Sequence, residues 1–135
     1  MKLPKAIVFD SWAIMAYLQD ERAGEQVADM IADAKEQGIP MLMSVINAGE
    51  IWYTVTRRRS EHDADQALRW VREIGIDLAD ATIELTRAAA KFKAKGGISY
   101  ADCFAAALAK HNQAALITGD REFQQLENEI EIVWL

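Results

Sequence analysis

The chain has 135 residues, of which 51% are hydrophobic and 27% charged, so we expect one globular domain that spans residues 1–135. No apolar stretch approaches the roughly 20 residues that a transmembrane helix needs, and the four apolar residues before Asp10 are too few for the core of a signal peptide. The single cysteine, Cys103, excludes an internal disulfide, and we expect a cytoplasmic protein without membrane contact. The net charge of −6 disfavours nucleic-acid binding by the whole surface, but it is compatible with a local basic patch or a bound cation.

The expected elements alternate between short strands and helices. In chain order they are a strand at 5–9, helices at 11–20 and 23–37, a strand at 39–43, helices at 45–59 and 61–74, a weak strand at 75–78, a helix at 81–95, a helix opened by Ser99, a strand at 114–117, a short helix from 121 and a strand at 130–135. Five short strands separated by helices predict an α/β fold with three layers, α/β/α, around a parallel sheet of about five strands. The sequence does not determine the order of the strands.

Four single acidic residues fall where strands give way to helices. They are Asp10 after the first strand, Glu50 in the second turn of the helix after the second strand, Asp102 in the first turn of the helix opened by Ser99, and Asp120 after the fourth strand. Because the carboxyl ends of parallel strands lie at one edge of a sheet, where ligands bind, we expect these four carboxylates to converge.

Each acid also has a purely structural interpretation. Asp10 and Asp120 are suitable N-caps for the helices that follow them, and Ser99 with Asp102 resembles a capping box in which Asp replaces Glu. Glu50 fits this interpretation least well, because the apolar residues around it predict a largely buried helix, where an unpaired charge is costly. These structural roles would have to explain four acids independently, whereas a single site explains them together.

Four neighbouring carboxylates repel one another, and a divalent cation relieves that repulsion. Oxygen ligands without a convincing Cys or His select Mg²⁺ or Mn²⁺ over Zn²⁺, and we expect His62 and His111 to be exposed helix residues. A carboxylate-held Mg²⁺ suits phosphate chemistry, in which a metal-activated water attacks a phosphodiester in line. The acids therefore predict a metal site that suits phosphate chemistry.

The acids lie in the stretches "IVFDSWAIMAYL", "SVINAGEIWYTV", "ISYADCFAAALAK" and "LITGDREF". With these stretches in this order, nearly the whole chain resembles a PIN domain of the small kind represented by the VapC toxins of prokaryotic toxin–antitoxin pairs. The resemblance implies an Mg²⁺- or Mn²⁺-dependent endoribonuclease whose products carry 5′-phosphate and 3′-hydroxyl ends, a homodimer, and a cognate VapB-type antitoxin. It also implies site residues: the metal ligands Asp10, Glu50, Asp102 and Asp120, and the accessory polar residues Ser11, Asn47, Thr118 and Glu122. Trp12 departs from the family, which often has a small or polar residue there. A bulky ring at this position either narrows the cleft or serves an interface, so it bears on the substrate preference and not on the metal site.

An acidic chain needs local cations to hold RNA. The candidates are Arg57, Arg58 and Arg59 at the end of one helix, Lys91, Lys93 and Lys95 at the end of another, and Arg121 beside Asp120. Cations at helix C-termini also complement the helix dipole, and we expect these C-termini at the sheet edge away from the acids.

Several alternatives stay open. The fold could bind RNA or a protein partner without cutting it, and the same metal chemistry could act on DNA or on structured substrates. The aromatic residues Trp12, Tyr17, Trp52 and Tyr53 are expected mainly in the core, with some at a dimer face or an antitoxin groove. Cys103 is expected to be a small core residue.

Overall fold

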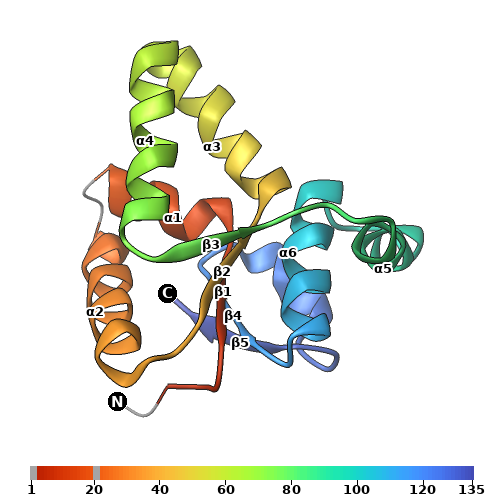
Figure 1. Ribbon diagram of the computed structural model, residues 1–135. Coiled ribbons are helices and arrows are strands. Elements are labelled where there is room, and N and C mark those ends of the chain that lie inside the picture. The colour runs from red at the N-terminus through yellow and green to blue at the C-terminus, as the bar shows by residue number, and fades with distance from the viewer. Residues whose placement is uncertain (1–2, 20–21) are drawn as a thin grey trace.

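Five parallel strands form one sheet in the order β3-β2-β1-β4-β5 (Figure 1). The structure is a computed structural model that describes residues 3–19 and 22–135. Within these residues the strands are β1 (Ile7–Phe9), β2 (Met41–Ser44), β3 (Ile76–Ala79), β4 (Ala115–Thr118) and β5 (Glu131–Trp134). The parallel five-stranded sheet is confirmed, including the weak third strand.

Helices cover both faces of the sheet (Figure 1). They are α1 (Ser11–Leu18), α2 (Arg22–Gln37), α3 (Val45–Arg58), α4 (Glu61–Glu73), α5 (Ile83–Ala94), α6 (Tyr100–His111) and the short 3₁₀ helix η1 (Arg121–Leu126). Side chains of α1 to α4 pack in one core cluster, and those of α5, α6 and η1 pack in the other. The three-layer α/β/α architecture is therefore confirmed.

The central strand β1 is apolar at every position because its side chains enter the cores on both faces of the sheet. Ile7 and Phe9 point into the core under α1 to α4, whereas Val8 points into the core under α5 and α6. Side chains alternate between the two faces of a strand, and a parallel sheet covered on both faces has no solvent-facing side. All three residues are fully buried.

The strand order places a crevice between β1 and β4. The chain first moves outward from β1 to β2 and β3, and then returns to the other side of β1 with β4 and β5. Open α/β sheets bind ligands outside the carboxyl ends of the strands at this reversal. The sequence alone did not predict this order.

Element boundaries differ slightly from the expected ones. β1 begins at Ile7, two residues later than predicted. α1 ends at Leu18, and the predicted last residue of that helix, Asp20, lies outside the described residues. Among residues 3–19 and 22–135, no helix combines the length and the apolar character that crossing a bilayer requires.

The α3–α4 pair extends beyond the sheet. α3 begins where β2 ends and continues past the edge of the sheet, and α4 returns beside it (Figure 1). The indole N–H of Trp52 on α3 donates to Asp65 Oδ1 on α4 at 2.9 Å. Tyr17 of α1 stacks on Trp70 of α4, with ring centroids 4.6 Å apart, which joins the base of this pair to the rest of the domain.

Candidate metal centre

A polar pocket of about 400 Å³ opens at the edge where α1, α3 and α6 begin. Four carboxylate side chains line it, those of Glu50, Asp102, Asp120 and Glu122. We call it the acidic pocket. Its lining also includes Ser11, Trp12, Met15, Ala16, Gln19, Thr54, Arg58 and Ser99. Three of the four acids predicted to converge therefore face one pocket, and Glu122 joins them.

Asp102, Asp120 and Glu122 form a close group of acids. Each offers a carboxylate oxygen, and these oxygens lie within 4.8 Å of one another. Helix caps bring them there. Ser99 Oγ accepts the backbone N–H of Asp102 at 3.2 Å, and Asp120 Oδ1 accepts that of Glu122 at 3.0 Å. The predicted N-cap of Asp120 is thus present, and so is the Ser99 half of the predicted capping box, at residues that also line the acidic pocket.

Asp10 lies beneath the acidic pocket and is 1% exposed. Its Oδ1 accepts the backbone N–H of Ala13 at 2.9 Å as the N-cap of α1, and its Oδ2 accepts the hydroxyl of Thr118. The Thr118 oxygen in turn accepts the backbone N–H of Asp120 at 3.0 Å. Asp10 and Asp120, at the ends of β1 and β4, are therefore connected through Thr118 across the crevice.

Two polar side chains hold the carboxylate of Glu50. Its Oε1 accepts Ser11 Oγ at 2.9 Å and Asn47 Nδ2 at 3.0 Å. Asn47 is fully buried, and its Nδ2 also donates to the carbonyl of Ala101 at 3.2 Å. Since an amide nitrogen has two protons, Asn47 links α3 to α6 and orients Glu50 with the same group.

Burial and repulsion raise the pKa of two of these carboxyls. Burial raises the pKa of Asp10 to about 7, against the opposing hydrogen bonds from Thr118 and Ala13 and with the help of the Asp102 and Asp120 charges. Burial, together with the charge of Asp120, also raises the pKa of Asp102 to about 7. The site thus brings several carboxyl groups together at one edge of the sheet.

The donor set fits a hard divalent cation. Glu50, Asp102, Asp120 and Glu122 offer only oxygen, the ligand type that Mg²⁺ and Mn²⁺ prefer. His62 and His111 are exposed, as expected, and neither lines the acidic pocket. A cation among the carboxylates would offset the repulsion that raises the pKa of Asp102.

The three consecutive arginines at the end of α3 lie in different environments. The guanidinium of Arg57 lies over the Tyr53 ring, 5.0 Å from its centroid, and Arg59 Nε lies 3.7 Å from an Asp63 carboxylate oxygen. Arg58 lines the acidic pocket. The expectation that this helix end lies away from the acids is therefore wrong for Arg58, because α3 runs outward along the pocket instead of back over the sheet (Figure 1).

Thr54 and Arg58 extend the face of α3 that begins with Glu50. The three residues are four positions apart, so they lie on one side of the helix. This spacing is visible in the sequence, although the direction of α3 is not.

Arg121, the predicted RNA contact outside the arginine run, has its guanidinium 4.6 Å from the centroid of the Trp134 ring.

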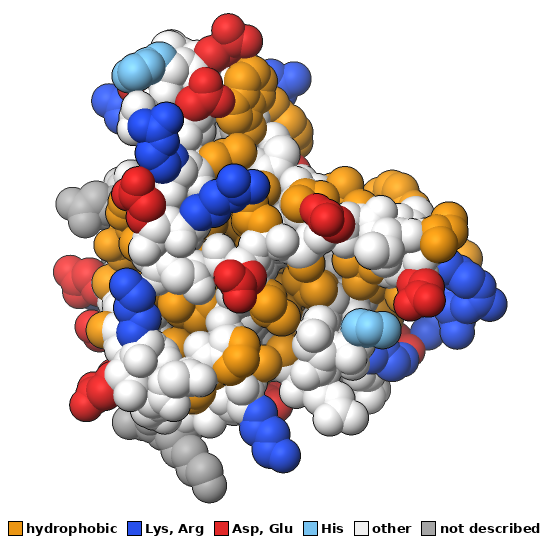
Figure 2. Space-filling view, viewed as in Figure 1, with side chains coloured by type: hydrophobic (Ala, Val, Ile, Leu, Met, Phe, Trp, Pro, Cys, Tyr) orange, Lys and Arg blue, Asp and Glu red, His pale blue; other side chains and the backbone are white. Residues whose placement is uncertain are grey.

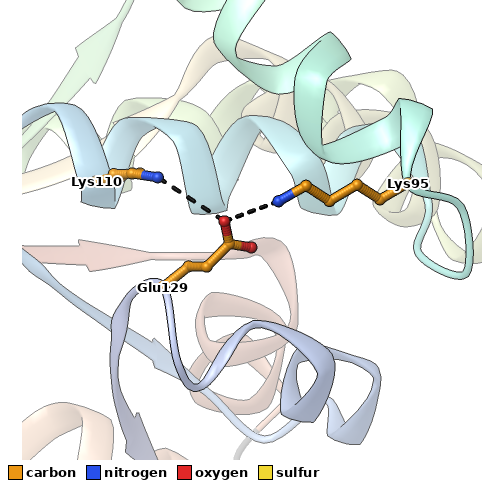
Figure 3. Close-up of polar contacts among 3 residues, drawn as sticks. All are labelled: Lys95, Lys110 and Glu129. Carbon is orange, nitrogen blue, oxygen red and sulfur yellow. Dashed lines mark hydrogen bonds and ion pairs between the residues drawn. The ribbon is translucent and has the colours of Figure 1, made fainter.

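Lysines gather at the far ends of α5 and α6. Figure 2 shows Lys and Arg side chains at the α5 end of the molecule with acidic side chains beside them. Lys95 and Lys110 both point at Glu129, with distances of 2.8 and 3.9 Å (Figure 3). The hydrogen bond from Lys95 lowers the pKa of Glu129. Lys93 donates to the carbonyl of Ile98 at 2.8 Å.

Cys103 is fully buried on α6, as predicted for a core residue. Burial raises the pKa of its thiol, which disfavours the reactive thiolate. Although it follows Asp102 in the chain, Cys103 belongs to the core under α5 and α6.

Comparisons with known proteins agree with this geometry. The model of the PIN domain matches residues 7–129. A search of curated protein sequences finds no match. Solved structures with the same fold include Mycobacterium tuberculosis VapC20, described as a Sarcin-Ricin loop cleaving toxin, with a TM-score of 0.75 and 16% identity over 96% of this chain and 100% of that one.

Two VapBC structures are also similar. A chain of the DNA-bound VapBC from Salmonella typhimurium has a TM-score of 0.76 and 13% identity over 96% of this chain and 98% of that one. A chain of VapBC-1 from nontypeable Haemophilus influenzae has a TM-score of 0.71 and 20% identity over 96% and 97%. At these identities the likeness concerns the fold, whereas the family model matches most of the chain, and the protein belongs to the PIN domain family.

Proposed function

We propose that this protein is an Mg²⁺- or Mn²⁺-dependent endoribonuclease that acts as the VapC-type toxin of a toxin–antitoxin pair. The observation that carries the proposal is the group of carboxylate oxygens of Asp102, Asp120 and Glu122 within 4.8 Å, in a pocket that Glu50 also lines, on a PIN domain. Support for RNA as the substrate comes from the similar VapC20 structure, which is described as a toxin that cleaves the Sarcin-Ricin loop.

The residues of the acidic pocket would have different roles in binding a cation. Asp102, Asp120 and Glu122 would bind it directly, and Glu50 would complete the set because Ser11 and Asn47 orient its carboxylate. When bound, Mg²⁺ or Mn²⁺ activates a water and neutralises phosphate oxygens. Asp10 holds the start of α1 and the end of β4 in their relative positions, because it caps α1 and is connected through Thr118 to Asp120.

The partners follow from the same proposal. A VapB-type antitoxin would inhibit the protein, as the VapBC complexes with the same fold suggest. We propose that the toxin forms a homodimer and acts in the cytoplasm, where its RNA substrate is found.

The proposal is tested first by thermal unfolding with and without Mn²⁺. A ligand at 100 times its Kd stabilises the folded state by about 2.7 kcal/mol, so the midpoint of wild type should rise by several degrees. Asp102→Asn should lose this rise, whereas Asp29→Asn, which changes an exposed acid on α2 outside the acidic pocket, should keep it.

Cleavage assays on single-stranded RNA and DNA follow, with excess EDTA as the control. Cleavage of RNA that EDTA abolishes is the expected result. If Mn²⁺ leaves the midpoint of wild type unchanged, or if cleavage persists in EDTA, the metal centre is wrong. A protein that binds Mn²⁺ and RNA but cuts neither nucleic acid would be a binding module, and one that cuts only DNA would have a different substrate.

A further inference from the structure

Trp12 occupies a different environment from the other tryptophans. Trp52 and Trp70 pack against the core under α1 to α4, and Trp134 packs against the core under α5 and α6. Trp12 is part of neither core cluster, is 37% exposed, and lines the acidic pocket. Packing of the domain interior therefore does not explain this large aromatic side chain.

The ring of Trp12 packs closely against the backbone of Gly119. A Cβ atom at Gly119 would lie less than 3.0 Å from Cη2, Cζ3 and Cζ2 of the ring, so any larger residue would displace it. Gly119 lies between Thr118 and Asp120, the residues that connect Asp10 to the acidic pocket. The ring thus lies against the residue that precedes a proposed metal ligand.

The acidic pocket is long enough for more than the reacting phosphate. On α3 its wall runs from Glu50 through Thr54 to Arg58, eight residues or about 12 Å of helix. On α1 the wall runs from Ser11 and Trp12 to Gln19. A strand of nucleic acid laid along this pocket would place a base beside Trp12 when a phosphate is near the acids.

A base is also the part of a nucleotide that an acidic site can hold without electrostatic cost. Four carboxylates repel a phosphate backbone, whereas stacking of a base on an aromatic ring is uncharged and tolerates any base. In a duplex, neighbouring base pairs occupy the faces of each base, so a ring at this position favours an unpaired nucleotide.

We infer that Trp12, packed against Gly119, is a stacking platform for an unpaired base of the RNA next to the scissile phosphate. The inference rests on the proposed nuclease function and adds to it the positioning of the substrate. It assigns a role to the residue at which the chain departs from the common family pattern.

The test measures binding of a labelled single-stranded 12-nucleotide oligouridylate, with Ca²⁺ in place of Mg²⁺, to wild type and three variants. Trp12→Leu removes the aromatic face, Trp12→Phe keeps a smaller one, and Tyr53→Leu removes an exposed aromatic residue outside the acidic pocket. We expect Trp12→Leu to bind about 5- to 150-fold more weakly, the range for stacking of one base. Trp12→Phe should lose less, and Tyr53→Leu should bind as wild type does.

A second oligomer of the same charge, in which abasic ribose phosphates replace the bases, separates stacking from other effects. Wild type should bind it more weakly than oligouridylate, and Trp12→Leu should bind both oligomers equally. This comparison within wild type holds even if a Trp12 variant fails to fold. If wild type binds both oligomers equally, or if Trp12→Leu binds oligouridylate as wild type does, the platform is refuted.

Parallel assays with Mn²⁺ distinguish the two proposals. A wild type that is stabilised by Mn²⁺ and cleaves RNA, while Trp12→Leu keeps full RNA affinity, refutes the platform alone. A wild type that neither responds to Mn²⁺ nor cleaves RNA refutes the proposed function. Loss of antitoxin binding by Trp12→Leu, with RNA affinity unchanged, would assign the ring to the protein partner and also refute the platform.

Discussion

At the scale of one residue, the carboxyl of Asp102 lowers the stability of the metal-free protein. Burial and the charge of Asp120 raise its pKa to about 7 in the folded state. An unfolded chain has an ordinary aspartate pKa near 3.9. Between these values the folded state binds the extra proton, so the stability of the metal-free protein falls as pH rises from about 4 to 7. Below this window both states are protonated and the penalty is absent.

Replacement of Asp102 by Asn should therefore stabilise the metal-free protein at high pH. We expect a gain of about 1–2 kcal/mol in the free energy of unfolding at pH 8, after allowance for screening by solvent, and almost none near pH 4.5. Urea unfolding in EDTA at both pH values measures this difference. Asp29→Asn, in an exposed position, is the control and should change little at either pH. A gain of equal size at both pH values would show that the raised pKa is not its cause.

At the scale of the element, the sequence predicted helix starts well because caps are local. Asp10, Ser99 and Asp120 were each placed at a helix start, and in each the side chain accepts a backbone N–H from the first turn. Strand order and the direction of α3 could not be predicted in this way, because they depend on which distant faces pack together. For that reason the position of Arg58 in the acidic pocket was missed, although the spacing of Glu50, Thr54 and Arg58 is plain in the sequence.

Substitution of two helical glycines tests how closely the helices pack. A Cβ at Gly24 would lie 2.7 Å from the carbonyl oxygen of Ala16, so α2 contacts α1 through this residue, whereas a Cβ at Gly49 on α3 would meet nothing within 4 Å. Gly24→Ala should destabilise the domain by about 1–2 kcal/mol, because overpacking exceeds the gain in helix propensity. Gly49→Ala should stabilise it by about 0.5–1 kcal/mol. Chemical unfolding of the two variants measures both, and a stabilising Gly24→Ala would contradict the close packing of α1 on α2.

At the scale of the whole molecule, the proposed RNA substrate is a polyanion that an acidic protein would have to hold through local cations. The net charge is −6, and the structure shows that many cationic side chains are engaged elsewhere. Lys95 and Lys110 contact Glu129, Arg59 contacts Asp63, and Arg121 lies over Trp134. The sequence predicted candidates for RNA contact by charge alone, and only the fold distinguishes among them, since Arg58 is the member of the arginine run that lines the acidic pocket.

The salt dependence of RNA binding follows from this distinction. Each phosphate that a cation neutralises on a single strand contributes about 0.7 to the slope of log affinity against log salt concentration. Arg58→Gln should therefore lower the slope by about that amount, whereas Arg57→Gln, whose guanidinium lies over Tyr53, should leave it unchanged. Titrations of the single-stranded 12-mer at several salt concentrations, with Ca²⁺ present, measure both slopes. Thermal midpoints close to that of wild type are the check on folding. If the slope of Arg58→Gln equals that of wild type, the outer end of the acidic pocket does not bind phosphate, and the strand must leave the acids in another direction.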